Sequence, residues 1–281
     1  MEDIKIDFWQ PETIIDGISK KFHISEEILF QLLNEYEDTD KVISILLNKK
    51  HILQQVNYFD RVFIKCSHVT KMPDKSLLNT NGLMSLTELL KRKDSYLVKF
   101  LQDEKITINL NKRILKYRDK EKHFSVEDNL GSTLIYDKGE IEAFYYSKNN
   151  KSMIEYSCVK NYPEILCTID KFLKDNLNVS SNLGKKWSEL AKGFDIISFY
   201  VNINDTTYIS GKNNELTDFI DLDDRYKNSI NIKNDIILDS LWLLEFGIEC
   251  WYDKLGGDEY LGIRNDFIVP YKELAIQHID D

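Results

Sequence analysis

The sequence predicts an α+β protein built on a split, largely antiparallel sheet. Apolar residues recur at helical spacing over residues 12–48 and in several later segments, whereas residues 61–69 and 194–203 alternate and are rich in β-branched side chains. Strands and helices are mixed without the regular βα alternation that builds a parallel sheet. The chain has 281 residues, 42% of them apolar, which is enough to bury a substantial core.

Residues 1–57 are expected to form a helical module. The segment "SEEILFQLLNEY" places Ile28, Leu32 and Leu33 on one helical face, and "DTDKVISILL" starts at a cap formed by Asp38 or Thr39. Short helices of this kind make a small bundle, vaguely similar to ubiquitin-associated modules. The alternative is a helical appendage that packs on the main domain.

Residues 58–281 are expected to form the main domain, beginning with the strand "RVFIKCSHV". Helices are predicted at 74–80, 85–92 and about 95–103, the second of them opening with a capping box. The segment "KITINLNKRILKY" predicts a hairpin. "STLIYDKGEIEAFYY" predicts two more strands around a turn at residues 137–139.

The second half of the main domain contains a predicted helical insertion around residues 150–255. Pro163 starts the helix "PEILCTIDKFLKDNL", residues 194–203 form a strand, and residues 204–235 form a polar surface excursion. Residues 236–252 are strongly apolar but include three acidic residues, which predicts a buried helix and not a membrane span. The strands "DEYLGIR" and "DFIVPYKELAIQ" close the domain, the second interrupted at Pro270.

Charge and cysteine usage restrict the functional class. Acidic residues number 47 against 37 basic ones, and a net charge of −10 disfavours nucleic acid as a partner. The basic run at residues 91–93 is typical of a solvated helix face. The cysteines are scattered and no signal-peptide pattern opens the chain, so free thiols, a cytoplasmic location and no membrane association are expected. His23, His51, His123 and His278 have no acidic or thiol neighbours at ligand spacing, so no metal is expected.

A candidate site begins in "FIKCSHVTKMPDKSLLNTNGL", where a strand ends on His68 and Thr70 and a short helix then closes on Gly82 and Leu83. This pattern resembles the start of the ADP-ribosyltransferase fold, especially its DNA-targeting toxin and RNA 2'-phosphotransferase branches. In that fold the strand-end histidine reaches the ribose of bound NAD, and a small hydroxyl residue contacts the nicotinamide amide. The resemblance therefore implies that His68 and Thr70 bind NAD.

The end of the chain adds a second part of the resemblance in "DEYLGIRNDFIVPYKELAI". These families place a catalytic glutamate on a late strand, followed by an aromatic and an aliphatic residue, shortly before a proline-containing last strand. The matching residue is Glu259, whose carboxylate would stabilise positive charge on the ribose as nicotinamide leaves, or orient or deprotonate the acceptor.

The resemblance also implies an aromatic residue that stacks on nicotinamide from a central strand. "EAFYYSKN" offers Phe144, Tyr145 and Tyr146, and alternation points Tyr145 away from its two neighbours. Either Tyr145 or Tyr146 is expected to meet the NAD cleft.

Each of these residues also has a purely structural interpretation. His68 can be a hydrogen-bonded strand-end histidine, Thr70 a turn cap and Glu259 an exposed strand residue. The two tyrosines can be the core and the surface of one strand.

Two hypotheses about function follow. The first is an ADP-ribosyltransferase-like protein, acting in phage–bacterium conflict, that binds NAD and transfers ADP-ribose to a protein side chain, a nucleobase or a small molecule. The alternative is a non-enzymatic phage or prophage protein that binds and inhibits a host or anti-phage defence protein. The Asn-, Lys- and Ile-rich composition favours such an origin, and Trp9, Trp187 or tyrosines on an acidic surface would anchor the partner.

Overall fold

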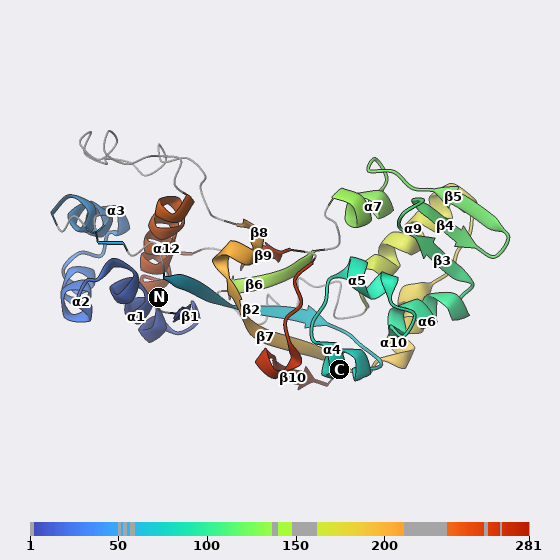
Figure 1. The fold of residues 1–281 in the computed structure, drawn as a ribbon, viewed down its shortest axis with the longest axis horizontal. Helices are drawn as coiled ribbons and strands as arrows, with labels where there is room; N and C mark the ends of the chain where they lie inside the picture. Colours follow the sequence, from blue (N-terminus) through green and yellow to red (C-terminus); the bar gives the residue numbers. More distant parts are fainter. Residues whose placement is uncertain are drawn as a thin grey trace.

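The computed structural model describes residues 3–49, 52, 55–56, 60–136, 140–147, 162–210, 235–255, 258–264 and 266–280. The molecule is elongated, with the N-terminal helices at one end, a seven-stranded sheet in the middle and a lobe of helices with a three-stranded sheet at the other end (Figure 1). The predicted α+β class with a largely antiparallel sheet is confirmed.

The seven-stranded sheet has the order β10-β7-β2-β6-β9-β8, and β1 pairs with the first half of β2. The β1–β2 pairing is parallel and the others are antiparallel. Ser67 of β2 lies opposite Ser198 of β7 and opposite Phe144 of β6, so β2 is central. The strands are β1 (Asp3–Ile6), β2 (Arg61–Thr70), β6 (Ile141–Ser147), β7 (Phe194–Asn202), β8 (Thr206–Ile209), β9 (Asp258–Ile263) and β10 (Ala275–Ile279).

The N-terminal helices share one hydrophobic core with this sheet. They are α1 (Pro11–Phe22), α2 (Glu26–Glu35) and α3 (Thr39–Ser44), the last followed by a π-helical turn (Ile45–Lys49). Asp38 caps α3 as predicted, accepting a hydrogen bond from the Lys41 amide. The predicted apolar helix is α12 (Asp235–Trp251), which packs on α1 and α3; at Gly247 an added Cβ would lie 2.9 Å from Ile18 Cδ1, so glycine permits the close approach.

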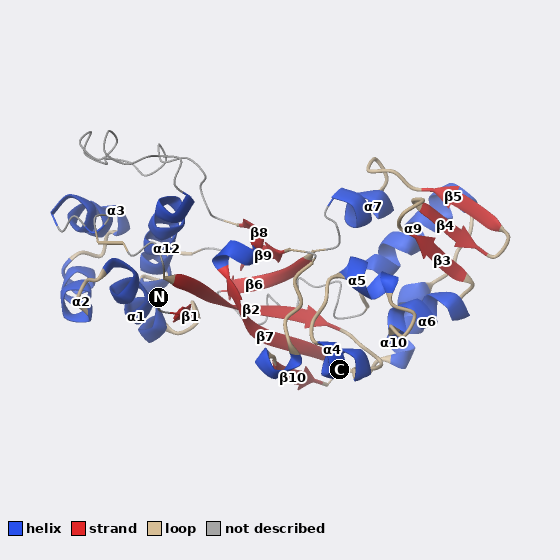
Figure 2. Ribbon diagram, in the orientation of Figure 1, coloured by secondary structure: helices blue, strands red, loops and turns tan. Residues whose placement is uncertain are grey.

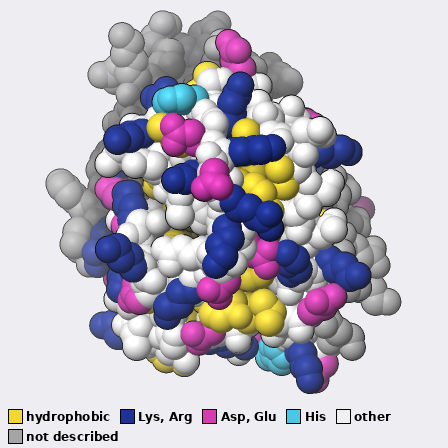
Figure 3. Space-filling model, turned by 90° about the vertical axis from the view of Figure 1, so that its right-hand side faces the viewer, with side chains coloured by type: hydrophobic (Ala, Val, Ile, Leu, Met, Phe, Trp, Pro, Cys, Tyr) yellow, Lys and Arg dark blue, Asp and Glu magenta, His cyan; other side chains and the backbone are white. Residues whose placement is uncertain are grey.

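The second lobe has a core of its own. It contains α5 (Leu86–Lys91), α6 (Tyr96–Asp103), α7 (Asn129–Gly131), α9 (Glu164–Leu177), α10 (Leu183–Leu190) and the small sheet β3 (Ile106–Asn109), β4 (Ile114–Tyr117) and β5 (Lys120–His123) (Figure 2). The Trp187 indole N–H donates to the Lys71 carbonyl just after β2, which ties the lobe to the large sheet. Lys and Arg side chains on the outer end of the lobe are interspersed with Asp and Glu, forming a surface of mixed charge (Figure 3).

The link from β2 to the lobe contains α4 (Ser76–Asn81), and a 3-10 turn (Tyr271–Glu273) precedes β10. A further short 3-10 turn (Ile203–Asp205) connects β7 to β8.

Several local predictions need correction. The segment "STLIY" is a π-helical turn (Ser132–Tyr136) and not a strand, because Asp128 caps the Gly131 amide and starts a helix there. The short strands β1, β5 and β8 were not predicted, and β8 lies in the expected polar excursion. The turn at 137–139, most of the excursion, and Cys158 lie outside the described residues. Within the described ranges, no helix combines the length and apolarity needed to span a bilayer.

Candidate functional site

The residues singled out from the sequence lie on three neighbouring strands of the large sheet. His68 and Thr70 are on β2, Tyr145 and Tyr146 on β6, and Glu259 on β9. Ser67, Phe144 and Tyr260 are register partners, so their side chains share one face. Because side chains alternate along a strand, His68 and Glu259 both point to the opposite face. Antiparallel pairing thus brings these distant segments side by side.

His68 occupies a position where β2 and β6 begin to separate. The two strands share the register pair Ser67–Phe144, and beyond it the imidazole Nδ1 lies 2.8 Å from the Glu142 carbonyl oxygen. A carbonyl only accepts, so Nδ1 carries the proton and Nε2 is an acceptor in the neutral ring. Burial lowers the pKa of His68, although the Glu142 carbonyl partly opposes the shift. The side chain is therefore a neutral imidazole at neutral pH.

Thr70 ends β2 beside a charged cluster that the sequence did not predict. Its register partner is Asp195 on β7, which in turn pairs with His278 on β10. The Asp195 carboxylate is only 1% exposed and contacts Lys75 Nζ at 2.6 Å and His278 Nδ1 at 2.8 Å. The one available signal was an aspartate at the second position of the apolar strand "FDIISFY".

Glu259 is held by a hydroxyl at the end of β8. Ser210 Oγ donates to Glu259 Oε2 at 2.6 Å, while it accepts from the Tyr260 amide at 2.8 Å. The Ser210 carbonyl accepts from the Tyr145 hydroxyl at 2.6 Å, so one serine connects the carboxylate to the buried tyrosine. Sequence reasoning did not identify Ser210.

Glu259 lies in a region of negative electrostatic potential. Burial raises the pKa of Glu249, and the charge on Glu259 adds to the shift against the opposing effect of Lys254. Burial also raises the pKa of Cys250, with contributions from the charges of Glu249 and Glu259. Both residues lie in the last turn of α12, where the helix dipole is negative. This region stabilises positive charge.

The two tyrosines are packed in the core. Tyr145 is fully buried against Phe8, Trp242 and Phe246, and Tyr146 is 6% exposed against Phe246. Burial raises the pKa of Tyr145, and raises that of Tyr146 to about 12. An irregularity in β6 between Phe144 and Tyr146 interrupts the expected alternation. Neither ring presents an open face to a ligand in this conformation.

The two flanking motifs are joined in space. The Leu83 amide donates to the Val269 carbonyl at 2.9 Å, and the Val269 amide donates to the Leu83 carbonyl at 3.0 Å. Gly82 precedes this bridge with φ +85°, and an added Cβ would lie 2.0 Å from the Val269 oxygen. The helix closing on Gly82 and Leu83 therefore meets the segment that enters Pro270.

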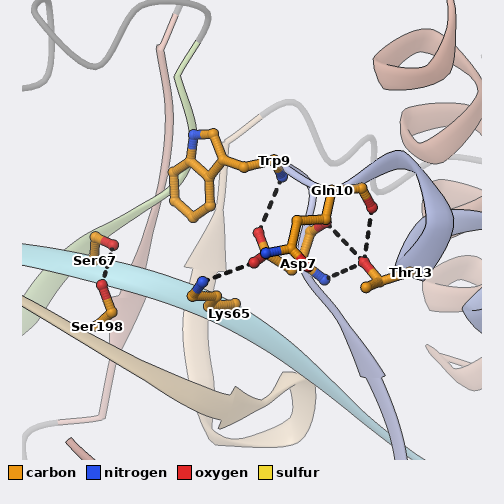
Figure 4. Close-up of polar contacts among 7 residues, drawn as sticks. All are labelled: Asp7, Trp9, Gln10, Thr13, Lys65, Ser67 and Ser198. Carbon is orange, nitrogen blue, oxygen red and sulfur yellow. Dashed lines mark hydrogen bonds and ion pairs between the residues drawn. The ribbon is translucent and has the colours of Figure 1, made fainter. Parts of the chain in front are cut away.

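The opposite face of β2 carries a polar network that fixes the entry into α1 (Figure 4). Asp7 accepts from the Trp9 amide and pairs with Lys65 Nζ at 2.7 Å, while Ser67 and Ser198 share a hydrogen bond of 2.9 Å. The Trp9 indole N–H donates to the Ser147 carbonyl. The expectation that Trp187 anchors a partner is wrong, because its side chain is 3% exposed in the lobe core.

A cavity of about 40 Å³ lies between α1, the start of β2 and α12. Lys21 and Asp239 are among its lining residues; Lys21 is 3% exposed, and burial lowers its pKa against the opposing charges of Asp60 and Asp239. This volume is large enough for only a few water molecules and is far below the roughly 300 Å³ of small ligand pockets. In the described parts of the chain, no cluster of three or more His, Cys, Asp and Glu side chains is arranged to hold a metal.

Comparisons of the chain with protein-family models, with curated proteins and with solved structures find no match.

Proposed function

We propose that the chain is an ADP-ribosyltransferase-like enzyme that binds NAD on the sheet face carrying His68 and Glu259. The observation that supports this most directly is the adjacency of β2, β6 and β9, which carry the expected site residues in neighbouring strands. The shared orientation of His68 and Glu259 is a further support, since opposite faces would exclude a common ligand.

The polar residues fit the ribose end of NAD. The neutral His68 ring has an acceptor nitrogen for a ribose hydroxyl, and Thr70 lies two residues farther along the same face. Glu259 lies in a region of negative electrostatic potential, which suits a cationic group. The buried rings of Tyr145 and Tyr146 do not fit stacking on nicotinamide. Tyr145 instead supports Glu259 through Ser210.

NAD, when bound, supplies the ADP-ribosyl group and nicotinamide as the leaving group. The bond between ribose and nicotinamide breaks, and a bond between ribose and an acceptor forms. Glu259 stabilises the positive charge on the ribose and takes the acceptor's proton, while Ser210 orients the carboxylate. The acceptor class is a protein side chain, a nucleobase or a small molecule.

The proposal is tested by thermal unfolding with and without NAD and by chromatographic measurement of released nicotinamide. NAD is expected to raise the melting temperature by mass action. Glu259→Gln keeps the shift but lowers nicotinamide release by about 10²–10³-fold, as for loss of one electrostatic stabiliser. His68→Ala reduces the shift.

Matched controls come from exposed residues on β5, namely His123→Ala and Glu121→Gln, which should behave as wild type. Absence of both a thermal shift and nicotinamide release in the wild-type protein would reject the enzyme proposal. The non-enzymatic, partner-binding alternative would then be preferred.

A further inference from the structure

The face of the sheet opposite Glu259 carries an exposed pair of aromatic rings. Tyr208 on β8 is 38% exposed and Tyr260 on β9 is 45% exposed. Their ring centroids are 6.0 Å apart with planes at 82°, an edge-to-face arrangement. Two large exposed rings in contact on one face are a more specific feature than a single surface tyrosine.

Gly262 allows Tyr208 to lie flat across β9. A Cβ at this position would be 2.4 Å from Tyr208 Cε1, so any other residue would displace the ring. The Tyr208 hydroxyl reaches β6 and donates to Glu142 Oε1 at 3.1 Å. Burial of the hydroxyl raises the pKa of Tyr208, and the Glu142 charge adds to the shift. These contacts therefore hold the Tyr208 ring in position in the absence of a partner.

Two carboxylates border the rings. Glu142 is exposed and Glu140 is half-buried, and Thr207 Oγ donates to Glu140 Oε2 at 2.6 Å. Within the described ranges, the side-chain partners of both carboxylates are hydroxyl groups, and neither carboxylate forms an ion pair. Two negative charges beside two electron-rich ring faces attract a cation and offer it no intramolecular competitor from those ranges.

We propose that this acid–aromatic patch, formed by Tyr208, Tyr260, Glu140 and Glu142, is the docking site for an arginine-bearing extended segment of a partner protein. A guanidinium is planar, so it stacks on a tyrosine ring while its N–H groups donate to a carboxylate in a bidentate manner. Charge complementarity and ring geometry support this docking site, which does not depend on NAD binding.

The last strand in the described part of the sheet, β8, borders the patch. An extended segment running beside β8 would present alternate side chains to the rings and carboxylates. This geometry favours arginines at every second position of the partner segment.

The test is fluorescence anisotropy with a labelled eight-residue peptide that alternates arginine and threonine. A peptide with citrulline in place of arginine keeps the shape but removes the charge, and it should bind at least tenfold more weakly. Tyr260→Ala should weaken binding of the arginine peptide about fivefold, and the double variant Glu140→Gln, Glu142→Gln should weaken it tenfold or more.

The controls separate the patch from general attraction to an acidic protein. Tyr271→Ala removes a tyrosine that is also 45% exposed, and Glu121→Gln with Glu127→Gln removes two exposed charges elsewhere. Both should leave affinity unchanged. Equal losses in the patch and control variants, or equal binding of the citrulline peptide, would overturn the proposal. Tyr260→Ala should keep the thermal response to NAD, which distinguishes failure of this proposal from failure of the enzyme proposal.

Discussion

At the scale of single residues, His68 makes a structural contact that is compatible with its proposed role in binding NAD. Its Nδ1 donates to the Glu142 carbonyl next to the register pair Ser67–Phe144. The imidazole therefore adds a side-chain hydrogen bond between β2 and β6. This contact gives the residue the structural role that the sequence left open. It also sets the tautomer, which leaves Nε2 as the acceptor that the proposed function uses.

The lowered pKa of His68 predicts a pH dependence of stability. The folded-state pKa lies below the ordinary value of 6.5, so protonation favours the unfolded chain. The contribution of the neutral ring is complete above about pH 6.5 and is lost as the pH falls through the window between 6.5 and the folded pKa. Urea unfolding at pH 7.5 and pH 5 should show a smaller acid destabilisation in His68→Gln than in wild type. His123→Gln, on exposed β5, should match wild type; identical pH dependence in all three proteins would contradict this assignment.

At the scale of elements, regular helices, long strands and the β3–β4 hairpin followed their local patterns, but several other short or bulged elements did not. The strands β1, β5 and β8 have four residues each, which gives only a weak alternation signal. The equally short β3 and β4 were predicted because a turn signal lies between them. In β6 the irregularity between Phe144 and Tyr146 directs both tyrosines into the core, which a strict period of two does not allow. The sequence ranges of the strands β2, β6 and β9 could thus be predicted, whereas the orientation of individual side chains on β6 could not.

The bridge between Leu83 and Val269 predicts the effect of a small substitution. Gly82→Ala places a methyl group against the Val269 carbonyl at a backbone angle of φ +85°, and it should reduce the free energy of unfolding by about 1–3 kcal/mol. Chemical denaturation measures the change. Asn178→Gly relaxes another left-handed residue, at the end of α9, and should change stability by less than about 1 kcal/mol. A Gly82→Ala protein as stable as wild type would contradict the close contact.

At the scale of the whole molecule, most buried apolar residues belong to one large core shared by the N-terminal helices and the sheet, or to a separate core in the lobe. A third, small cluster contains Val69 and Phe194. The hydrogen bond from Trp187 to the Lys71 carbonyl is a specific link between the sheet and the lobe. The domain boundary expected near residue 57 is not accompanied by a division of the core, because α1 and α12 pack together beside the sheet.

Separate cores predict separate cooperative units. Leu166→Ala in the lobe and Leu244→Ala on α12 each remove a fully buried side chain and should cost about 2–5 kcal/mol. Hydrogen exchange should show that Leu166→Ala weakens protection in residues 96–130 and 164–190, while Leu244→Ala weakens it in the large sheet. A uniform loss of protection in either variant would show that the molecule unfolds as one unit.

Local patterns in the chain were sufficient to place most helices, the central strands and the α+β class, because propensity, capping and periodicity act over a few residues. They also singled out His68, Thr70 and Glu259 as candidate site residues by motif and order. The three-dimensional packing alone set the Leu83–Val269 bridge, the Thr70–Asp195–His278 row and the burial of Tyr145 and Tyr146. These features depend on strand partners far apart in the chain and on one irregularity in β6, and neither leaves a local signal.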